Sequence, residues 1–297
     1  MKKIALFPYL AILMASGCTA QPKPVFKVSS DNNTLLWQVT GKDLKKPSFL
    51  FGTFHLLCKN DINFSTQLKS AVQYADSIYM ELDLDDPSTM MSGLLYLNMK
   101  NGKKLKDFYT PEEYKKIEDY FNDSLQMPMI MFQKAKPYFL MALLYPKMMK
   151  CKTFSGVDEE IMTLAKQNNK QIIGLETMEF QSSIFDSIPY ELQAEELLKN
   201  IDSLDKYKNE FDTLMQAYKS QQLNAMEELM GKSEFAMEKY ENLLVNYRNV
   251  NWVKQLKEIM KNKSAFVAVG AGHLLGEKGL INLLKVEGYV VEPMENK

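Results

Sequence analysis

The stretch Ser48-Phe49-Leu50-Phe51-Gly52-Thr53-Phe54-His55 decides the fold. Its apolar and aromatic residues predict a buried strand that ends close to Gly52. A second stretch near the C-terminus has the same form, because the apolar run Ala265-Phe266-Val267-Ala268-Val269 leads into Gly270-Ala271-Gly272-His273. Both strands are therefore expected to end at a glycine that precedes a histidine by three residues.

His55 and His273 are the two histidines of the chain, and a Leu-Leu pair follows each of them. Glycine adopts dihedral angles that other residues avoid, so Gly52 and Gly270 are expected to let the chain leave each strand sharply and turn the histidine back over the sheet edge. Ligands of open α/β sheets bind beyond the carboxyl ends of the strands. The paired motifs therefore favour a functional site over the alternative, two core histidines with satisfied hydrogen bonds.

The rest of the sequence predicts strands separated by helices. Further strands are expected at residues 35–39, 77–82, 171–174 and 289–291. Helices are expected at residues 64–74, from Pro111 onward, and at 132–149, 157–168, 190–230 (with breaks), 234–262 and 277–287. This order predicts an α/β fold, with a central mixed sheet and a large helical insertion between its N- and C-terminal halves. No linker or repeat divides residues 35–297, so we expect a single domain there.

The first residues predict an export signal. Lys2 and Lys3 precede an apolar run and the small residues Ala15-Ser16-Gly17, and Cys18 follows directly. This pattern predicts a signal peptide at residues 1–17 and resembles a lipobox, in which the cysteine is acylated. We expect lipidation of Cys18, a tether at residues 18–34, and a membrane-anchored protein on the periplasmic or extracellular side. The alternative is a plain secretory signal that is cleaved near Ala20.

Charge and cysteine content narrow the class of protein. The chain has 36 basic and 37 acidic residues, a formal net charge of -1, and 46% hydrophobic residues, as in an ordinary globular protein. It has no long basic stripe, which argues against a nucleic-acid partner. Apart from Cys18, two cysteines remain, Cys58 and Cys151. An even number in an exported chain favours a disulfide, and two buried thiols are the alternative.

A carboxylate is expected to join the two histidines. Glu81 lies at the end of the predicted strand 77–82, and Tyr79, Asp83 and Asp85 share its parity along the chain. Two imidazoles and one carboxylate form a recurrent metal-binding set that leaves positions open for water and substrate. The sequence therefore predicts a metal site made of His55, Glu81 and His273.

These motifs resemble the TraB/GumN group, which includes the TIKI metalloproteases and the pheromone-shutdown proteins. The resemblance extends over roughly residues 35–293. The residues that carry it are Phe49 through His55, Tyr79-Met80-Glu81-Leu82-Asp83, Gly174-Leu175-Glu176-Thr177, Arg248-Asn249-Val250-Asn251-Trp252 and Phe266 through Gly279.

The resemblance implies that His55, Glu81 and His273 are the essential positions of a peptidase that needs a divalent metal such as manganese or cobalt. The group is also similar to erythromycin-esterase-like hydrolases, in which similar residues work without bound metal. The segment Gly156-Val157-Asp158 matches a Gly-hydrophobic-Asp segment of the family only loosely. Asp158 is therefore given little weight.

The expected mechanism uses one divalent ion (manganese, cobalt or zinc) to activate a water molecule against a peptide or protein substrate. Glu176 is the candidate general base, because Glu81 is a predicted ligand. Arg248, the one arginine of the chain, is expected either to stabilise an oxyanion or to form a structural ion pair. Two other hypotheses stay open: a metal-independent ester or amide hydrolase, and a non-catalytic lipoprotein that sequesters peptides.

Overall fold

A six-stranded sheet with the order β6-β4-β7-β2-β1-β8 forms the centre of the protein. The computed structural model describes residues 25–232 and 240–297, so the predicted signal peptide and Cys18 lie outside the described residues. The strands are β1 (Leu36–Thr40), β2 (Ser48–Thr53), β4 (Ser77–Met80), β6 (Ile172–Gly174), β7 (Ala265–Gly270) and β8 (Val290–Pro293). Strands β6, β4, β7 and β2 run parallel, whereas β1 is antiparallel to β2 and to β8. The predicted mixed sheet is confirmed.

The register of the two central strands places the two Gly-x-x-His motifs side by side. Thr53 at the end of β2 pairs with Gly270 at the end of β7. Since the strands are parallel, the residues that follow them leave the sheet at the same edge. Strand β4 is the other neighbour of β7, so Glu81, which follows Met80, leaves at that edge too.

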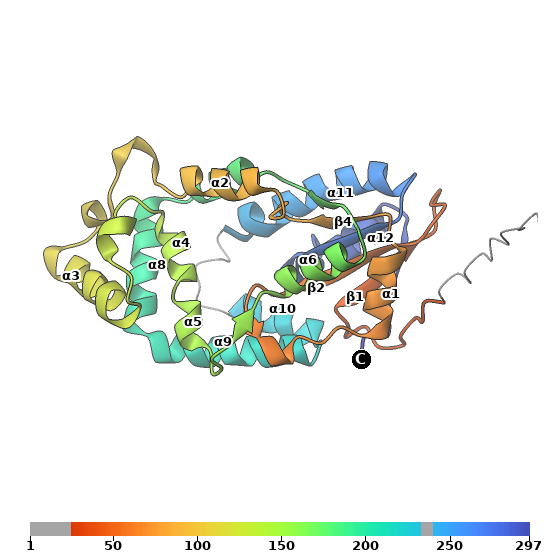
Figure 1. The fold of residues 1–297 in the computed structure, drawn as a ribbon, viewed down its shortest axis with the longest axis horizontal. Coiled ribbons are helices and arrows are strands. Elements are labelled where there is room, and N and C mark those ends of the chain that lie inside the picture. Colours follow the sequence, from red (N-terminus) through yellow and green to blue (C-terminus); the bar gives the residue numbers. More distant parts are fainter. Residues whose placement is uncertain (1–24, 233–239) are drawn as a thin grey trace, which may run out of the picture.

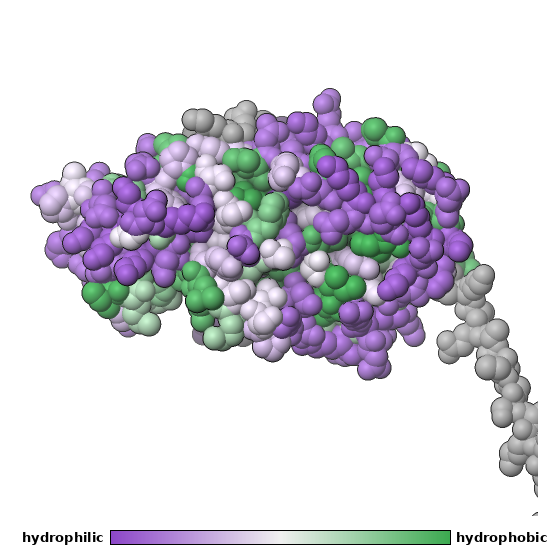
Figure 2. Space-filling view, turned by 90° about the horizontal axis from the view of Figure 1, so that it is seen from above, coloured by the Kyte–Doolittle hydropathy of each residue, from purple (hydrophilic) through white to green (hydrophobic). Residues whose placement is uncertain are grey.

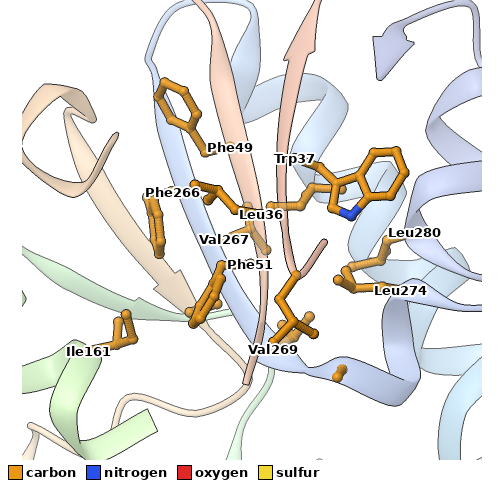
Figure 3. Close-up of a cluster of buried hydrophobic side chains, with 14 of the residues drawn as sticks. Leu36, Trp37, Phe49, Phe51, Ile161, Phe266, Val267, Val269, Leu274 and Leu280 are labelled. Atoms are coloured by element: carbon orange, nitrogen blue, oxygen red, sulfur yellow. The ribbon is translucent and has the colours of Figure 1, made fainter. Parts of the chain in front are cut away.

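Helices cover both faces of the sheet, which explains why β2 is buried along its whole length. Helices α1 (Thr66–Tyr74) and α6 (Val157–Gln167) lie on one face, and α11 (Tyr247–Met260) and α12 (Leu280–Val286) lie on the other (Figure 1). Figure 3 shows the two apolar layers that result. Phe49, Phe51, Phe266 and Ile161 lie on one side of the strands, and Trp37, Leu274 and Leu280 lie on the other. Burial of this apolar surface from water is the main force that holds the sheet in place.

The large helical insertion lies between β4 and β7 in the sequence. Besides α6 and α11, which lie on the sheet, its α-helices are α2 (Pro87–Tyr96), α3 (Pro111–Asp119), α4 (Pro137–Ala142), α5 (Tyr145–Met148), α7 (Met178–Asp186), α8 (Tyr190–Asp202), α9 (Leu204–Lys219) and α10 (Leu223–Lys232). Helices α3, α4, α5 and α8 extend away from the sheet on one side, at the left of Figure 1. This part has an apolar cluster of its own, which includes Leu105, Phe121, Leu140 and Tyr207.

Several predicted boundaries were wrong. The helix expected at 132–149 is divided into α4 and α5, with Pro137 and Pro146 in their first turns. Proline lacks the amide hydrogen that a helix interior needs and is tolerated only at a helix start, so each proline begins a new helix. The strand expected at 77–82 ends at Met80. Helix α7 was not predicted from the sequence.

A short ribbon links the segment after His55 to the segment before α6. Strands β3 (Leu57–Cys58) and β5 (Phe154–Ser155) pair in antiparallel fashion. Cys58 and Cys151 form a disulfide beside this pair, with their Cα atoms 5.8 Å apart. The ribbon therefore brings together two stretches of chain that are about 100 residues apart in sequence.

The surface is mostly hydrophilic, with separate apolar patches on the face that Figure 2 shows. Helix α2 exposes Met90, Met91, Leu94 and Leu95. Within residues 25–232 and 240–297, no helix combines the length and the apolar character that a membrane span requires.

Candidate functional site

The candidate site lies at the carboxyl edge of the central strands, where Glu81 and His273 meet. Glu81 follows β4, and His273 lies in the 3₁₀ turn Ala271–Leu274 that follows β7. Nε2 of His273 is 3.8 Å from Oε1 of Glu81. Both side chains are nearly buried, with 8% of the His273 side chain and 13% of the Glu81 side chain exposed. The structure thus brings together two of the three residues predicted to form the site.

Arg248 of α11 connects the members of this cluster. Its Nε donates to Glu176, and its Nη2 donates to Glu81 and Glu176, both at 2.5 Å. Its Nη1 lies 2.9 Å from the carbonyl oxygen of Leu244 and 3.1 Å from Nε2 of His273. A guanidinium has five N–H groups, and each of the five in Arg248 faces one of these oxygen or nitrogen atoms. Of the two roles expected for Arg248, the structural ion pair matches this arrangement. Arg248 has no N–H group left that could bind an oxyanion.

Glu81 is ionised in this environment. Burial alone would raise the pKa of Glu81, but the neighbouring His273 and the Arg248 guanidinium lower it well below its usual range. The backbone amide of Gly270 also donates to Oε1 of Glu81, at 2.9 Å. Glu81 therefore ties the end of β4 to the end of β7 through Oε1 and to Arg248 of α11 through Oε2.

Glu176 lies deeper than Glu81, with 4% of its side chain exposed. Its oxygens accept hydrogen bonds from Arg248, from Nε1 of Trp252 at 3.2 Å and from Nε2 of Gln181 at 3.1 Å. Burial raises the pKa of Glu176, although Arg248 acts in the opposite direction. Because both oxygens of Glu176 accept hydrogen bonds from these residues, Glu176 is placed to hold Arg248 and not to act as the predicted general base.

The ring of His273 has a partner at each nitrogen. Nδ1 lies 2.7 Å from Oδ1 of Asn249, and Nε2 faces Arg248. The ring also packs on Trp252, with the ring centroids 4.5 Å apart. Burial lowers the pKa of His273 to about 3, so the imidazole is neutral at physiological pH.

His55 has the opposite environment. Its Nδ1 lies 2.9 Å from Oδ2 of Asp158, while 78% of its side chain is exposed. The other oxygen of Asp158 accepts a hydrogen bond from Oγ1 of Thr53. The hydrogen bond with Asp158 raises the pKa of His55 to about 9, and the charges of Glu81 and Arg248 also act on it. His55 therefore lies within electrostatic reach of the buried cluster, but it is held by its own partner.

Gly52 and Gly270 are needed because other groups of the site lie close to their Cα atoms. The sequence had suggested a different reason, unusual dihedral angles at the strand ends. Neither Gly52 nor Gly270 has a positive φ. A Cβ on Gly52 would lie 3.0 Å from the Cβ of Ala271 and 3.0 Å from Cδ1 of Leu274, in the turn that carries His273. A Cβ on Gly270 would lie 3.3 Å from Oε1 of Glu81. Glycine is needed here because a side chain would separate the parts of the site.

Some expectations about neighbouring residues were wrong. Because β4 ends at Met80, the alternation through Asp83 and Asp85 does not continue toward the site, and Asp85 instead forms an ion pair with Lys166. Sequence reasoning also missed Asn249 and Gln181, and it gave too little weight to Asp158. Asn249 is adjacent to Arg248, which was a usable signal. In the sequence, only the Gly156-Val157-Asp158 segment indicated that Asp158 contacts His55.

A metal ion was expected between His55, Glu81 and His273, and the donor types suit such an ion. The positions do not fit, because Nε2 of His273 faces Arg248, and the two oxygens of Glu81 accept from Arg248 and from the Gly270 amide. Within the described parts of the chain, no three His, Cys, Asp or Glu side chains lie close enough to hold one ion together. No reaction step below is therefore routed through a metal.

The fold and the site define an α/β protein with a His–Glu–Arg cluster at the carboxyl edge of its sheet. The chain belongs to the TraB/PrgY/gumN family, whose sequence profile matches residues 35–293, so the resemblance found in the motifs is confirmed. It is similar to the metalloprotease TIKI1 of Danio rerio, with 22% identity over 93% of this chain and 65% of that protein. It is also similar to the metalloprotease TIKI2 of Danio rerio, with 23% identity over 91% of this chain and 62% of that protein.

The chain spans slightly less than two thirds of the length of these TIKI relatives. A bacterial relative is covered more fully: the uncharacterized protein YbaP of Shigella flexneri is 24% identical over 80% of this chain and 88% of its own length. No solved structure matches the chain.

Proposed function

We propose that the protein is a hydrolase that cleaves peptide bonds at the edge of the sheet between His55 and the buried cluster. The observation that carries the proposal is the pair formed by His55 and Asp158, which leaves the imidazole exposed to solvent beside a buried, charged site. The names of the TIKI relatives support a protein or peptide substrate.

In this proposal His55 is the group that transfers protons. Asp158 accepts a hydrogen bond from Nδ1–H, so that Nε2 of the neutral ring has a free lone pair. Nε2 takes a proton from a water molecule whose oxygen forms the new bond to the scissile carbonyl carbon. When the carbon–nitrogen bond breaks, the same proton passes to the leaving amine, which restores neutral His55.

The buried cluster supplies the frame for this chemistry. Arg248 joins Glu81 after β4, Glu176 two residues after β6, and the turn that follows β7. Glu81 and Glu176 carry two carboxylates against the single guanidinium of Arg248. Glu81 raises the pKa of His55, which makes the ring a stronger base.

A second candidate is the same cleavage with a divalent ion, manganese, cobalt or zinc, as the cofactor. The TIKI relatives support it, because they are named metalloproteases. An ion at this site would require Arg248 to move away from Glu81 and His273. Exhaustive chelation separates the two candidates. Activity that survives chelation supports the first candidate, and activity that is lost and then restored by added metal supports the second.

The first test is cleavage of a library of unstructured peptides by the purified protein. His55→Gln should reduce the cleavage rate by about 10²–10⁴-fold, the usual contribution of general acid–base catalysis. Asp85→Asn is the matched control, because Asp85 forms an exposed ion pair with Lys166 away from the site. Peptide binding without product, unaffected by His55→Gln, would instead indicate the non-catalytic binding protein.

We also propose that the protein works outside the cytoplasm and is tethered through acylated Cys18. The sequence of the first residues supports the export signal, and the disulfide between Cys58 and Cys151 suits an oxidising compartment. Mass spectrometry of the mature N-terminus tests this. An acylated cysteine as first residue is expected, and Cys18→Ala should release the protein from the membrane fraction.

A further inference from the structure

Asn249 has an amide group whose orientation is fixed by its surroundings. Its Nδ2 lies 2.8 Å from the carbonyl oxygen of Lys278 and 3.2 Å from the carbonyl oxygen of His273. Carbonyl oxygens only accept hydrogen bonds. The reversed amide would place Oδ1 against two other oxygens with no hydrogen between them. The amide nitrogen must therefore face the two carbonyls.

This orientation determines which nitrogen of His273 carries the proton. Oδ1 of Asn249 faces Nδ1 of His273 at 2.7 Å, and an amide oxygen is an acceptor only. Nδ1 must therefore be the donor. A neutral imidazole has one protonated nitrogen, so Nε2 then carries the lone pair.

The other side of the ring leads to the same result independently. Nε2 of His273 lies 3.1 Å from Nη1 of Arg248. A guanidinium has donors only and stays protonated in proteins. Nε2 must accept here, because a proton on it would point at a proton of Arg248. Donor and acceptor requirements on opposite sides of the ring thus select one tautomer.

We infer that Asn249 is a positioning residue that fixes His273 in its Nδ1–H tautomer and thereby directs the Nε2 lone pair at Arg248. The lone pair is the fifth acceptor of the guanidinium. In the other tautomer, Nη1 would lose this acceptor and meet an N–H group, which would displace Arg248 from Glu81. Asn249 therefore acts on the arrangement of Arg248 and Glu81 through the imidazole.

The catalytic meaning of this inference rests on the proposed function, but the tautomer is measured without any assay of activity. NMR on the whole chain with ¹⁵N-labelled histidine distinguishes protonated from unprotonated ring nitrogens. Because the chain has two histidines, the His55→Gln variant leaves His273 as the only signal and assigns it. We expect a neutral His273 ring with a protonated Nδ1 and an unprotonated Nε2. A protonated Nε2, or comparable amounts of both tautomers, would overturn the inference.

Variants of Asn249 test whether this residue is the cause. Asn249→Leu removes the acceptor at Nδ1 and leaves Arg248 alone to select the tautomer. The fraction of His273 rings with a protonated Nε2 should therefore rise above that of the parent. Asn282→Leu is the matched control, since Asn282 also donates to a backbone carbonyl, that of Glu277 at 2.8 Å. It should leave the His273 signal unchanged. An Asn249→Leu protein that folds and retains the single tautomer would contradict the role of Asn249.

If Asn249→Leu does not fold, the spectrum of the chain with Asn249 intact still decides the tautomer. If the protein hydrolyses no peptide, the proposed function fails while the tautomer result stands. In an active protein, Asn249→Leu should lower kcat more than it changes KM, because Asn249 acts on the arrangement of the site and not on the substrate.

Discussion

Asp158 holds Nδ1 of His55 at 2.9 Å and leaves most of the imidazole open to solvent. The carboxylate lies in the first turn of α6, and the histidine follows β2, so two separate elements must be aligned for the contact to form. His273 is the counterpart at the end of β7, where a neutral amide takes the place of the carboxylate. The two motif histidines therefore differ in charge: the pKa of His55 is raised to about 9, and that of His273 is lowered to about 3.

The rate of peptide cleavage should depend on the protonation of His55. As a base, His55 must be neutral, so the rate should rise with pH until it levels off near the pKa of about 9. Asp158→Asn removes the main cause of the raised pKa and should move the midpoint of the profile toward the ordinary value of 6.5. The measurement is kcat/KM against pH for both proteins. A midpoint that stays in place in Asp158→Asn would contradict the assignment of His55.

The stability of the protein should also depend on this pair. Because the pKa of His55 is raised from 6.5 to about 9 in the folded protein, the ion pair contributes fully below pH 6.5 and its contribution is lost as the pH rises through about 9. Urea unfolding at about pH 6 and at about pH 10 measures this change. The free energy of unfolding should fall between these values more in the parent than in Asp158→Asn. An equal fall in both proteins would show that the pair does not contribute.

Removal of Arg248 should destabilise the protein strongly. Arg248→Met leaves Glu81 and Glu176 as buried carboxylates without their cation, and breaking a buried pair in this way costs about 3–5 kcal/mol. Urea unfolding at neutral pH provides the measurement. Lys257→Met is the control on the same helix, because its ion pair with Glu287 lies at the surface. If both variants lose the same small amount of stability, the cluster is not the structural frame described above.

The close contact between β2 and the His273 turn should make Gly52 intolerant of a side chain. In Gly52→Ala the new Cβ meets Ala271 and Leu274 at 3.0 Å, and overpacking of this kind costs about 1–3 kcal/mol. Gly231→Ala in α10 is the control, because no atom of the described residues lies within 4 Å of its Cβ position. It should be neutral or stabilise the helix by up to about 1 kcal/mol. Thermal unfolding compares the two, and an unchanged midpoint in Gly52→Ala would contradict the packing argument.

The sequence was sufficient for features that depend on short stretches of chain. The apolar runs of β2 and β7 and the motifs that follow them are local, so the sheet and both histidines were predictable. The division of residues 132–149 was also visible in Pro137 and Pro146, which the prediction did not use.

Features that depend on distant contacts could not be predicted. The acceptors of Arg248 come from four segments, at Glu81, Glu176, Leu244 and His273, and no pattern in the sequence shows that they use all five of its donors. The choice between an oxyanion donor and a structural ion pair therefore required coordinates. The pairing of Asp158 with His55 is similar, because it depends on the β3–β5 ribbon between segments that are far apart.

Because the disulfide between Cys58 and Cys151 lies beside the β3–β5 ribbon, the stability of this ribbon should depend on the compartment in which the protein is found. In a reducing cytoplasm both sulfurs stay as thiols. Hydrogen bonds alone would then align His55 with its carboxylate, through the pairing of β3 with β5 and through the bonds from the Val157 amide to Phe54 and from Thr53 to Asp158. Under the proposed function, newly made chains would therefore be weaker catalysts until they meet an oxidising environment. Under the proposed function, oxidation would activate the protein as removal of a propeptide activates a zymogen, and it would protect the proteins of the cell that makes it.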